Sequence, residues 1–493
     1  MSLQHLVVVC LTLAAAPVAA QDAGVPEADA GTALETVVVG TPETRTAGST
    51  HTIDGARLKR FELDDAHAVL QAVPGVQVRG EDGFGLRPNI GLRGANPNRS
   101  QKVTLMEDGV LFGPAPYSAP AAYYFPLITR MEAVRVVKGP AAITYGPQTV
   151  GGAIDFITRD MGPGISAGLD LALGSYWYGK GHGWLALGTE NTSLLMELVH
   201  LRSDGFAQLD GGGNTGFGRT EAMLKARHRF TLGGLANAVT LKLGISGEES
   251  NETYLGLSDA NFRENPLRRY QASQLDHMSW LRTQLVLNHR LDGERFSLST
   301  TLYRNDLDRS WRKLNRFRGA AIANVLANPE SPRNQVYMGV LRGTLDSSSD
   351  SETLLIGPNQ RSYVSQGVES VFRTNFDTGP LTHAVEARAR YHYDAIRRNH
   401  TEDAFLVRDG ALVSAGEPTA TLVKNFAETH AVALSVTDAV SWGIVTLTPG
   451  VRVELINSAT RDSLTNTSAH GSTNVVLPGI GGHVAITENL GGM

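Results

Sequence analysis

The chain has 493 residues, enough for several ordinary domains or for one very large architecture. Its net charge is −5, so its bulk charge does not indicate a nucleic-acid partner. No run of eighteen or more apolar residues occurs, which excludes an ordinary membrane-spanning helix beyond the N-terminal segment. Strands of a membrane barrel escape that test, because they carry only alternating hydrophobicity.

The N-terminus has the organisation of a secretory signal peptide. An apolar run at 6–16 is followed by small residues that predict cleavage after Ala20. The first five residues lack Lys and Arg, so an N-terminal anchor helix is the alternative. The only cysteine, Cys10, lies in the apolar run. Cleavage of the signal peptide would therefore leave a mature chain that has no thiol and no disulfide. We expect residues 1–20 to be a signal peptide.

A linker and a short extended segment come next. Residues 21–33 are rich in Ala, Gly, Asp, Glu and Pro, which is typical of a flexible linker. Val and Thr within 34–40 favour an extended backbone, and Pro42 stops the run. An exposed segment of this kind is ready for strand addition by a partner. The alternative is the first strand of the domain that follows.

The next hundred or so residues have the pattern of a compact α/β domain. Aspartates at Asp54 and Asp65, with apolar positions up to Val73, predict a helix that ends before Pro74. Three short alternating runs predict strands between Gly- and Pro-rich turns, and they lie at 102–106, 131–137 and 153–157.

Four motifs in this domain resemble the plug domain of TonB-dependent outer-membrane receptors. In chain order they are GLRG at 91–94, LMEDGV at 105–110, EAVRVVKGP at 132–140 and YGPQTVGGAI at 145–154. The last motif, with Pro116-Tyr117 in the preceding loop, is similar to the ferric-dicitrate branch. The resemblance implies a plug at residues 48–160, after a periplasmic linker at 21–47 that carries a TonB box at 34–40.

The resemblance also gives the extended segment a partner. Its core would pair with TonB, which works with a proton-driven inner-membrane complex, through Glu35, Thr36, Val37, Val38 and Val39. Members that also signal carry an extra domain ahead of this box, and about a dozen residues leave no room for it here. The resemblance therefore implies a transporter.

Beyond Arg159, segments of roughly ten residues alternate between apolar and polar side chains. In 383–394, one face is apolar and aromatic, and the other carries Glu386, Arg388, Arg390, His392 and Asp394. Similar segments lie at 168–176, 184–187, 193–202, 221–230, 239–246, 281–289, 296–303, 369–376, 429–437 and 451–455. A soluble sandwich is the alternative. With the plug ahead of it, we expect an all-β antiparallel transmembrane barrel at residues 161–493, with the plug in its lumen.

This barrel is expected to be incomplete. The family's barrel has 22 strands, whereas this part of the chain supplies about fourteen at the observed spacing. The chain also ends in NLGGM, where the family ends in an aromatic residue on a final strand. We expect a C-terminally truncated sequence. A smaller closed barrel is the alternative, although a full plug would hardly fit inside it.

Long polar segments with scattered aromatics predict external loops at 248–274, 304–365 and 399–425. Arginine forks bind carboxylates and phosphates bidentately, so basic groups there are candidates for binding an anionic ferric chelate. The strongest candidates are Arg312, Lys313, Arg316 and Arg318 in the basic segment at 309–318, for which lipopolysaccharide binding or simple solvation is the alternative. Weaker candidates of the same type are Arg268, Arg269, Arg388 and Arg390.

Tyr117 lies in the loop that the resemblance places at the apex of the plug. The ferric-dicitrate branch has glutamines in this loop, one of which contacts ligand, and here both positions are alanine, Ala119 and Ala121. That difference weighs against citrate itself and leaves a carboxylate-type chelate. Ion pairs between the plug and the barrel wall are expected at Glu132, Arg135, Lys138 and Arg159, because lone charges in a lumen are costly.

No motif of a zinc site, P-loop, nucleophile elbow or dinucleotide fold occurs. We therefore expect no catalytic residue, no metal site and no cofactor. Sequence and resemblance together predict an outer-membrane transporter of a ferric chelate, a siderophore or a ferric-citrate-like carboxylate, in contact with outer-membrane lipids and lipopolysaccharide. The alternatives are import of cobalamin, haem or a carbohydrate by the same architecture, and a passive or adhesive barrel.

Overall fold

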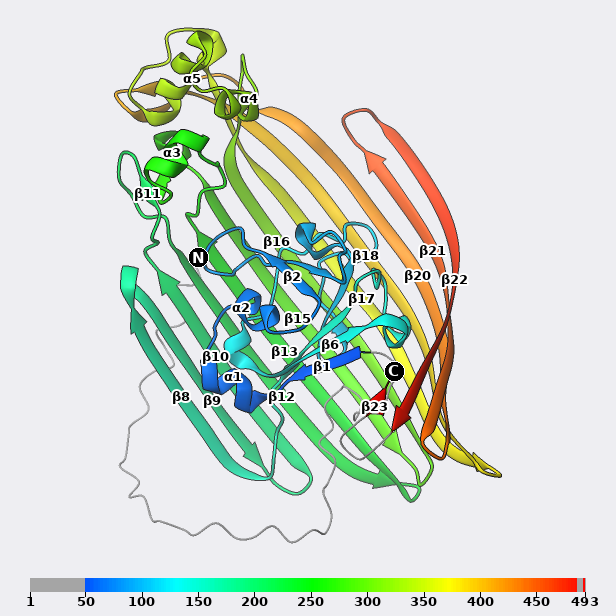
Figure 1. Cartoon of the computed structure of the whole chain (residues 1–493). Helices are drawn as coiled ribbons and strands as arrows, with labels where there is room; N and C mark the ends of the chain where they lie inside the picture. The colour runs from blue at the N-terminus through cyan, green and yellow to red at the C-terminus, as the bar shows by residue number, and fades with distance from the viewer. Residues whose placement is uncertain (1–48, 486–490, 493) are drawn as a thin grey trace, which may run out of the picture. The chain divides into compact units, whose positions relative to one another are not determined.

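The computed structural model describes residues 49–485 and 491–492. They form a small α/β domain, the plug, that lies against one face of a large curved sheet (Figure 1). The predicted signal peptide at 1–20, linker at 21–47 and TonB box at 34–40 lie outside the described residues. In the part of the chain that is described, no helix is long and apolar enough to cross a membrane.

Two short helices form where the sequence predicts one. The plug begins with β1 (Ser49–Ile53), α1 (Gly55–Phe61) and α2 (Ala66–Gln71). The carboxylates of Asp54 and Asp65 each accept a backbone N–H and so cap α1 and α2. Glu62, at φ 45°, takes the left-handed conformation that ends α1.

A mixed five-stranded sheet forms the centre of the plug, in the order β1-β6-β7-β4-β5. Its other strands are β4 (Val103–Glu107), β5 (Val110–Leu111), β6 (Met131–Lys138) and β7 (Gly152–Thr158). Only β4 and β7 pair in parallel, and β2 (Val76–Arg79) pairs with β3 (Asn89–Leu92) separately. The three strands predicted in this domain are confirmed.

Two glycines make the close geometry of this sheet possible. Gly109, at φ 76°, follows Asp108, at φ 51°, in the two-residue turn between β4 and β5, and Asp-Gly is favoured where both turn residues need positive φ. Gly152, at φ 144°, lies beside β6, where a Cβ would come within 2.3 Å of the Val137 carbonyl oxygen. A side chain at either position would strain the sheet.

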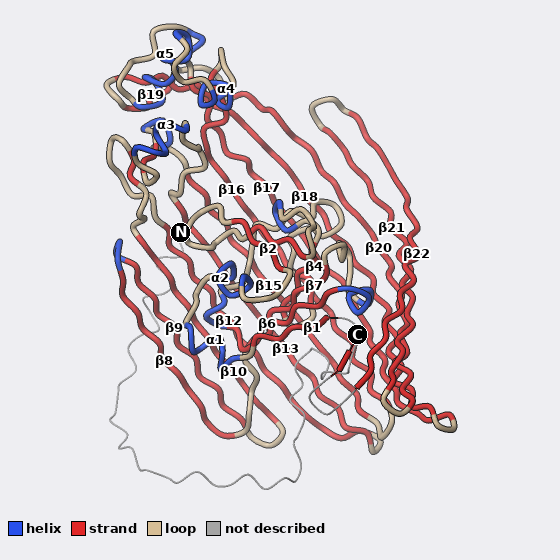
Figure 2. The backbone as a smooth tube through the Cα atoms, viewed as in Figure 1, coloured by secondary structure: helices blue, strands red, loops and turns tan. Residues whose placement is uncertain are grey.

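The large sheet has fourteen strands, antiparallel throughout, and it does not close on itself within the described residues (Figure 2). Its members are β8 (Gly164–Gly174), β9 (Tyr178–Gly188), β10 (Thr192–Ser203), β12 (Phe217–Leu232), β13 (Leu235–Ser250), β15 (His277–Asp292), β16 (Phe296–Phe317), β17 (Leu354–Thr378), β18 (Leu381–Arg408), β19 (Ala411–Ser414), β20 (Ala420–Trp442), β21 (Val445–Asp462), β22 (Thr467–Ala485) and β23 (Gly491–Gly492). Each alternating segment predicted from the sequence lies in one of these strands, except that 168–176 extends two residues past the end of β8. This agreement confirms the barrel-type fold in its partial form.

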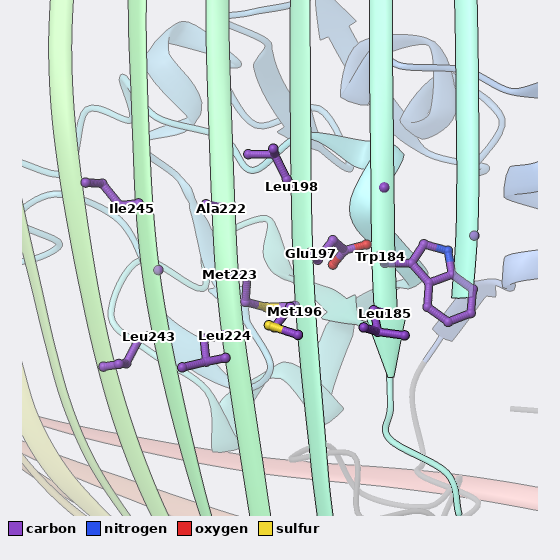
Figure 3. A pocket seen from close by; sticks show the side chains of 13 residues that line it. Trp184, Leu185, Met196, Glu197, Leu198, Ala222, Met223, Leu224, Leu243 and Ile245 are labelled. Atoms are coloured by element: carbon purple, nitrogen blue, oxygen red, sulfur yellow. The ribbon is translucent and has the colours of Figure 1, made fainter. Parts of the chain in front are cut away.

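The two faces of this sheet differ as predicted. Apolar side chains that point away from the plug lie in rows across four strands, such as Leu243, Leu224, Met196 and Leu185 (Figure 3). Small residues leave an apolar hollow of about 690 Å³ beside these rows. On β18, Tyr391 is 43% exposed, whereas the adjacent Arg390 and His392 are buried on the plug-facing side. An apolar outer face and a charged inner face suit a barrel in lipid.

The loop predictions at 304–365 and 399–425 are wrong in large part, because strands continue beyond their predicted ends. The strand β16 runs to Phe317, so Arg312, Lys313 and Arg316 lie on a strand and not in an external loop. Buried Leu314 and Phe317 pack against the loop helices, and the polar residues between them hide this strand in the sequence. The remaining loops carry β11 (Gln208–Leu209), β14 (Arg268–Arg269), α3 (Asp259–Glu264), α4 (Ile322–Ala327) and α5 (Pro332–Arg342).

Buried ion pairs join the plug to the sheet. The Glu107 carboxylate accepts hydrogen bonds from Arg130 at 2.8 Å and from Lys242 of β13 at 2.7 Å. Arg130 also donates to Glu221 of β12 at 2.5 Å, and Lys242 donates to Asp108 at 2.8 Å. Burial alone would raise the pKa of Glu107, but the surrounding cations hold that pKa well below its usual value. Each charge in this network stabilises the others, and losing one would leave an unpaired charge in a buried site.

Two adjacent plug carboxyls have opposite pKa shifts. Burial raises the pKa of both Asp108 and Asp155, but Lys225 and Lys242 bring the pKa of Asp108 down to about 2. Asp155 is buried beside the Asp108 charge, and its pKa rises to about 7 although Gly109 N–H donates to it at 2.9 Å. The Asp155 carboxyl therefore keeps its proton up to a higher pH than an ordinary aspartate does.

We expect the Asp155→Asn variant to lose part of the pH dependence of plug stability. The pKa of Asp155 is raised to about 7 in the folded state, compared with ~3.9 in the unfolded chain. The protonated carboxyl therefore contributes stability that is complete below pH ~3.9 and is lost as the pH rises through about 7. The substitution should therefore stabilise the plug at pH 8, by up to about 4 kcal/mol, and change little at pH 4. Calorimetric unfolding in detergent micelles measures this.

Asp108→Asn is the matched control, with the opposite sign. Its carboxylate stabilises the fold above the unfolded pKa, and that stability is lost only as pH falls through about 2. The control variant should be less stable than the wild type at neutral pH. Equal pH dependence in Asp155→Asn and the wild type would contradict the assignment of Asp155.

Candidate functional site

Cations and aromatic rings gather where the plug meets the extended ends of β16, β17 and β18. At their centre is Tyr123 of the plug. Its ring centroid lies 4.1 Å from the guanidinium carbon of Arg309, 5.2 Å from that of Arg99 and 5.7 Å from that of Arg361. We call this group the arginine–aromatic cluster, and its members are Arg99, Tyr123, Tyr254, Arg309, Trp311, Lys313, Arg361, Tyr363, Arg398 and His400.

Aromatic side chains form one side of the cluster. The ring of Tyr254, which is 51% exposed, meets the Trp311 ring edge-on at 4.8 Å. The Lys313 ammonium lies 5.0 Å from the Tyr254 ring and 5.7 Å from the Trp311 ring. Rings of this kind hold a cation over their faces and offer apolar area to a bound molecule.

Strand register places three arginines directly opposite one another. Arg309 of β16 pairs with Arg361 of β17, which in turn pairs with Arg398 of β18. We call these three residues the arginine row. Trp311 and Lys313 follow Arg309 at intervals of two, so β-strand alternation brings them to the same plug-facing side. Like charges directly opposite on adjacent strands repel, so this row is unfavourable on its own.

The arginine row has no carboxylate partner within 4 Å among the described residues. Arg361 Nε donates to His400 at 3.2 Å and Arg398 Nη1 donates to Asn425 at 3.2 Å, both neutral contacts. Arg309 is only 2% exposed, and its Nε and Nη1 have no hydrogen-bond acceptor in the described structure. The site therefore holds buried donors of positive charge that an anion could satisfy.

The pKa of Tyr123 reports the same positive charge. Burial raises this pKa, but the guanidinium groups of Arg309, Arg361 and Arg99 outweigh burial and bring it below its ordinary value. A phenol that ionises more readily than usual marks a site that stabilises negative charge.

Most of the predicted ligand arginines are already neutralised. Arg316 pairs with Glu402 at 3.1 Å, and Arg268 pairs with Asp210 at 2.7 Å. The other two pairs of this kind are Arg318 with Glu417 at 2.6 Å and Arg388 with Glu386 at 2.6 Å. Of the remaining candidates, Lys313 belongs to the cluster, Arg312 lies 5.6 Å from the Phe405 ring, and Arg269 donates to backbone carbonyls.

Tyr117 and Arg390 hold the plug loop against β18. The Asp394 carboxylate accepts the backbone N–H of Tyr117 at 2.7 Å and that of Ser118 at 2.9 Å. Arg390 donates to the Gly146 carbonyl at 2.6 Å and to the Tyr117 hydroxyl at 3.3 Å. These contacts fix the loop and leave the Tyr117 side chain outside the arginine–aromatic cluster.

The four residues predicted to form ion pairs between plug and wall differ in their contacts. Arg159 lies 3.9 Å from both Glu132 and Glu197 of β10, and its guanidinium carbon lies 4.2 Å from the Trp184 ring. Lys138 donates to the Pro74 carbonyl within the plug at 2.7 Å, so its described contact is not with the wall. Arg135 is near Asp155 of the plug and lowers that carboxyl's pKa.

Sequence reasoning missed the centre of the cluster. Arg309 begins the predicted basic segment at 309–318, but Arg361, Arg398 and Tyr123 come from distant segments that no spacing connects. Only the register of β16, β17 and β18 brings the arginines together. Within the described residues, no group of three or more His, Cys, Asp or Glu side chains could hold a metal ion.

Comparison with known proteins identifies the first domain. Residues 42–153 match the model of the TonB-dependent Receptor Plug Domain. The chain is 29% identical over 174 residues to the vitamin B12 transporter BtuB of Vibrio cholerae, a match that covers 32% of this chain and 28% of BtuB.

Solved structures share the fold of the whole described chain. The ferric citrate transporter FecA in its unliganded form matches with a TM-score of 0.68 at 22% identity, over 90% of this chain and 61% of FecA. The siderophore receptor PiuA from Acinetobacter baumannii matches with a TM-score of 0.67 at 13% identity, over 90% of this chain and 63% of PiuA.

The chain thus spans less than two thirds of the length of each of these relatives. Residues 42–153 therefore match the plug domain of TonB-dependent receptors, and the chain shares the fold of these solved receptor structures.

Proposed function

We propose that the chain is an energy-coupled outer-membrane transporter for an anionic ferric chelate, which binds at the arginine–aromatic cluster. The observation that carries the proposal is the arginine row, in which Arg309, Arg361 and Arg398 lie opposite one another without a carboxylate partner. FecA is described as a ferric citrate transporter and PiuA as a siderophore receptor, which agrees with this ligand class.

Charge favours an anion with several oxygen donors. Guanidinium groups bind carboxylates through paired, charge-assisted hydrogen bonds, which are stronger than neutral ones. Such a ligand would remove the repulsion along the arginine row and satisfy the free nitrogens of Arg309. Ferric complexes of polycarboxylates and of catecholates have this character. Trp311 and Tyr254 would cover the ligand's apolar parts.

Other ligands fit the cluster less well. BtuB is named as a vitamin B12 transporter, but a neutral ligand such as a carbohydrate or cobalamin would leave the guanidinium charges of the arginine row uncompensated. Haem carries carboxylates, so it is included as a competing ligand in the binding experiment below. A passive or adhesive barrel would make no use of an energy-coupling segment.

Energy coupling would enter through Glu35, Thr36, Val37, Val38 and Val39, which lie outside the described residues. This TonB box precedes β1 by about ten residues, and β1 is the edge strand of the plug sheet. A strand added by TonB and pulled by the proton-driven complex would therefore load β1 first, and then β6 through their backbone pairing. The predicted signal peptide would deliver the chain to the outer membrane, where lipid and lipopolysaccharide would contact the apolar outer face.

The first test of ligand binding is Arg309→Gln. We expect the affinity for ferric citrate to fall roughly 10- to 100-fold, because charge-assisted hydrogen bonds to the ligand are lost. The unfolding temperature should not fall, since the substitution removes a charge that its neighbours repel. Titration of purified protein in detergent, followed by tryptophan fluorescence, measures the affinity, with haem and cobalamin as competing ligands.

Arg304→Gln is the matched control. Arg304 lies on the same strand but on the outer face, where its side chain is 51% exposed and pairs with Asp306 at 2.8 Å. Its loss should leave ferric citrate binding unchanged. If both variants bound as the wild type does, the arginine row would not be the ligand site.

The test of energy coupling is deletion of residues 35–39. We expect radio-iron uptake from ferric citrate to be lost in cells that carry the deletion, although cell-surface binding persists, because the plug can no longer be pulled. A protonophore should have the same effect on the intact protein. Uptake that survives both treatments would show a passive barrel.

A further inference from the structure

Arg99 differs from the other cations of the arginine–aromatic cluster. Its Nη2 lies 2.5 Å from Glu81 Oε1, with side-chain exposures of 12% and 20%. Within the described residues, Arg309, Lys313, Arg361 and Arg398 have no such carboxylate partner. Arg99 also differs in origin, because it belongs to the plug and the others belong to the sheet.

The Glu81–Arg99 pair closes a ring of hydrogen bonds through Asn89. Asn89 Nδ2 donates to Glu81 Oε2 at 3.0 Å, and Asn89 Oδ1 accepts the backbone N–H of Arg99 at 2.8 Å. Asn89 is 1% exposed and is the first residue of β3. Hydrogen bonds therefore connect the Glu81–Arg99 ion pair directly to β3 of the plug.

The backbone at Arg99 is strained. Arg99 and Ser100 have φ values of 51° and 52°, in the left-handed region that side-chain-bearing residues rarely adopt. Besides Asn89, the turn is held by Ser100 Oγ, which accepts the Ile90 N–H at 3.0 Å and donates to the Pro88 carbonyl at 3.1 Å. A strained turn held by side-chain hydrogen bonds relaxes when those bonds are lost.

We propose that Glu81 is a built-in counter-ion that a bound anionic chelate displaces from Arg99, and that this displacement releases the strained Arg99–Ser100 turn. The proposal rests on the function proposed above and deepens it. Glu81 presents to Arg99 the same chemical group that a carboxylate chelate would present, so a ligand that engages Arg99 Nη2 competes with Glu81.

This competition makes the response specific for charge. A neutral molecule could contact Tyr123 and Trp311, but it has no means to replace the carboxylate of Glu81. An anionic ligand that engages Arg99 frees Glu81 and with it the acceptor for Asn89 Nδ2. The segment from Glu81 to Arg99, which includes β3, then has fewer constraints. Occupancy of the cluster is thereby converted into a change within the plug.

The experiment compares Glu81→Gln with the wild type in the full chain, purified in detergent. Glutamine keeps the size of the side chain and removes its charge. We expect the affinity for ferric citrate to rise roughly tenfold, since the internal competitor is lost. Hydrogen exchange of amides 98–101, measured by mass spectrometry without ligand, should rise to the level that ferric citrate produces in the wild type.

Asp210→Asn is the control. It breaks another carboxylate–arginine pair, with Arg268 at 2.7 Å and with similar exposures of 18% and 22%, but in the outer loops. It should change neither the affinity nor the exchange of amides 98–101.

Two outcomes would overturn the proposal: equal affinity of Glu81→Gln and the wild type for ferric citrate, or unchanged protection of the turn in the ligand-free variant. If the wild type does not bind ferric citrate, ferric citrate is excluded as its ligand. The ligand-free exchange of Glu81→Gln then still decides whether Glu81 holds the turn.

Discussion

The structure depends on one constraint, the neutralisation of charge buried between the plug and the sheet. Moving an ion from water into a buried site costs several kcal/mol unless a partner repays it. The outer face of the sheet is apolar, so its central strands carry their charged side chains toward the plug. Around Glu107 the constraint is met, because Arg130, Lys242 and Glu221 pair across the interface. The same ion pairs hold the plug in its place.

The arginine row departs from this constraint, and the proposed ligand site rests on that departure. Buried Arg309 and the half-buried Arg361 and Arg398 lie opposite one another, an arrangement that is unfavourable unless something outside the chain compensates it. The contrast is internal to one strand, since Arg316 near the end of β16 has Glu402 and Arg309 has no carboxylate partner in the described structure. The two arginines therefore differ in whether a carboxylate lies beside them.

Local and long-range features were not equally predictable from the sequence. The alternation in 383–394 predicted a strand correctly, because a period of two is a property of each strand alone. The arginine row was not predictable, since Arg309 and Arg361 are opposite only through a register that spans the loop with α4 and α5. The motifs of the plug predicted its strands but not the hydrogen bonds between Glu81, Asn89 and Arg99. Those bonds depend on a turn whose φ values side-chain-bearing residues rarely adopt.

The division of the cluster between plug and sheet has a mechanical consequence. Arg309, Arg361 and Arg398 belong to the sheet, which is held by continuous backbone pairing, whereas Arg99 belongs to the plug. An anion that contacts only the arginine row can bind without disturbing the plug. In the proposed mechanism, an anion that also engages Arg99 Nη2 must compete with Glu81, so part of its binding energy goes into loosening the plug turn. In the proposed mechanism, the size and charge of the ligand therefore decide together whether its binding changes the plug, because only differential contacts between two states can shift the balance between them.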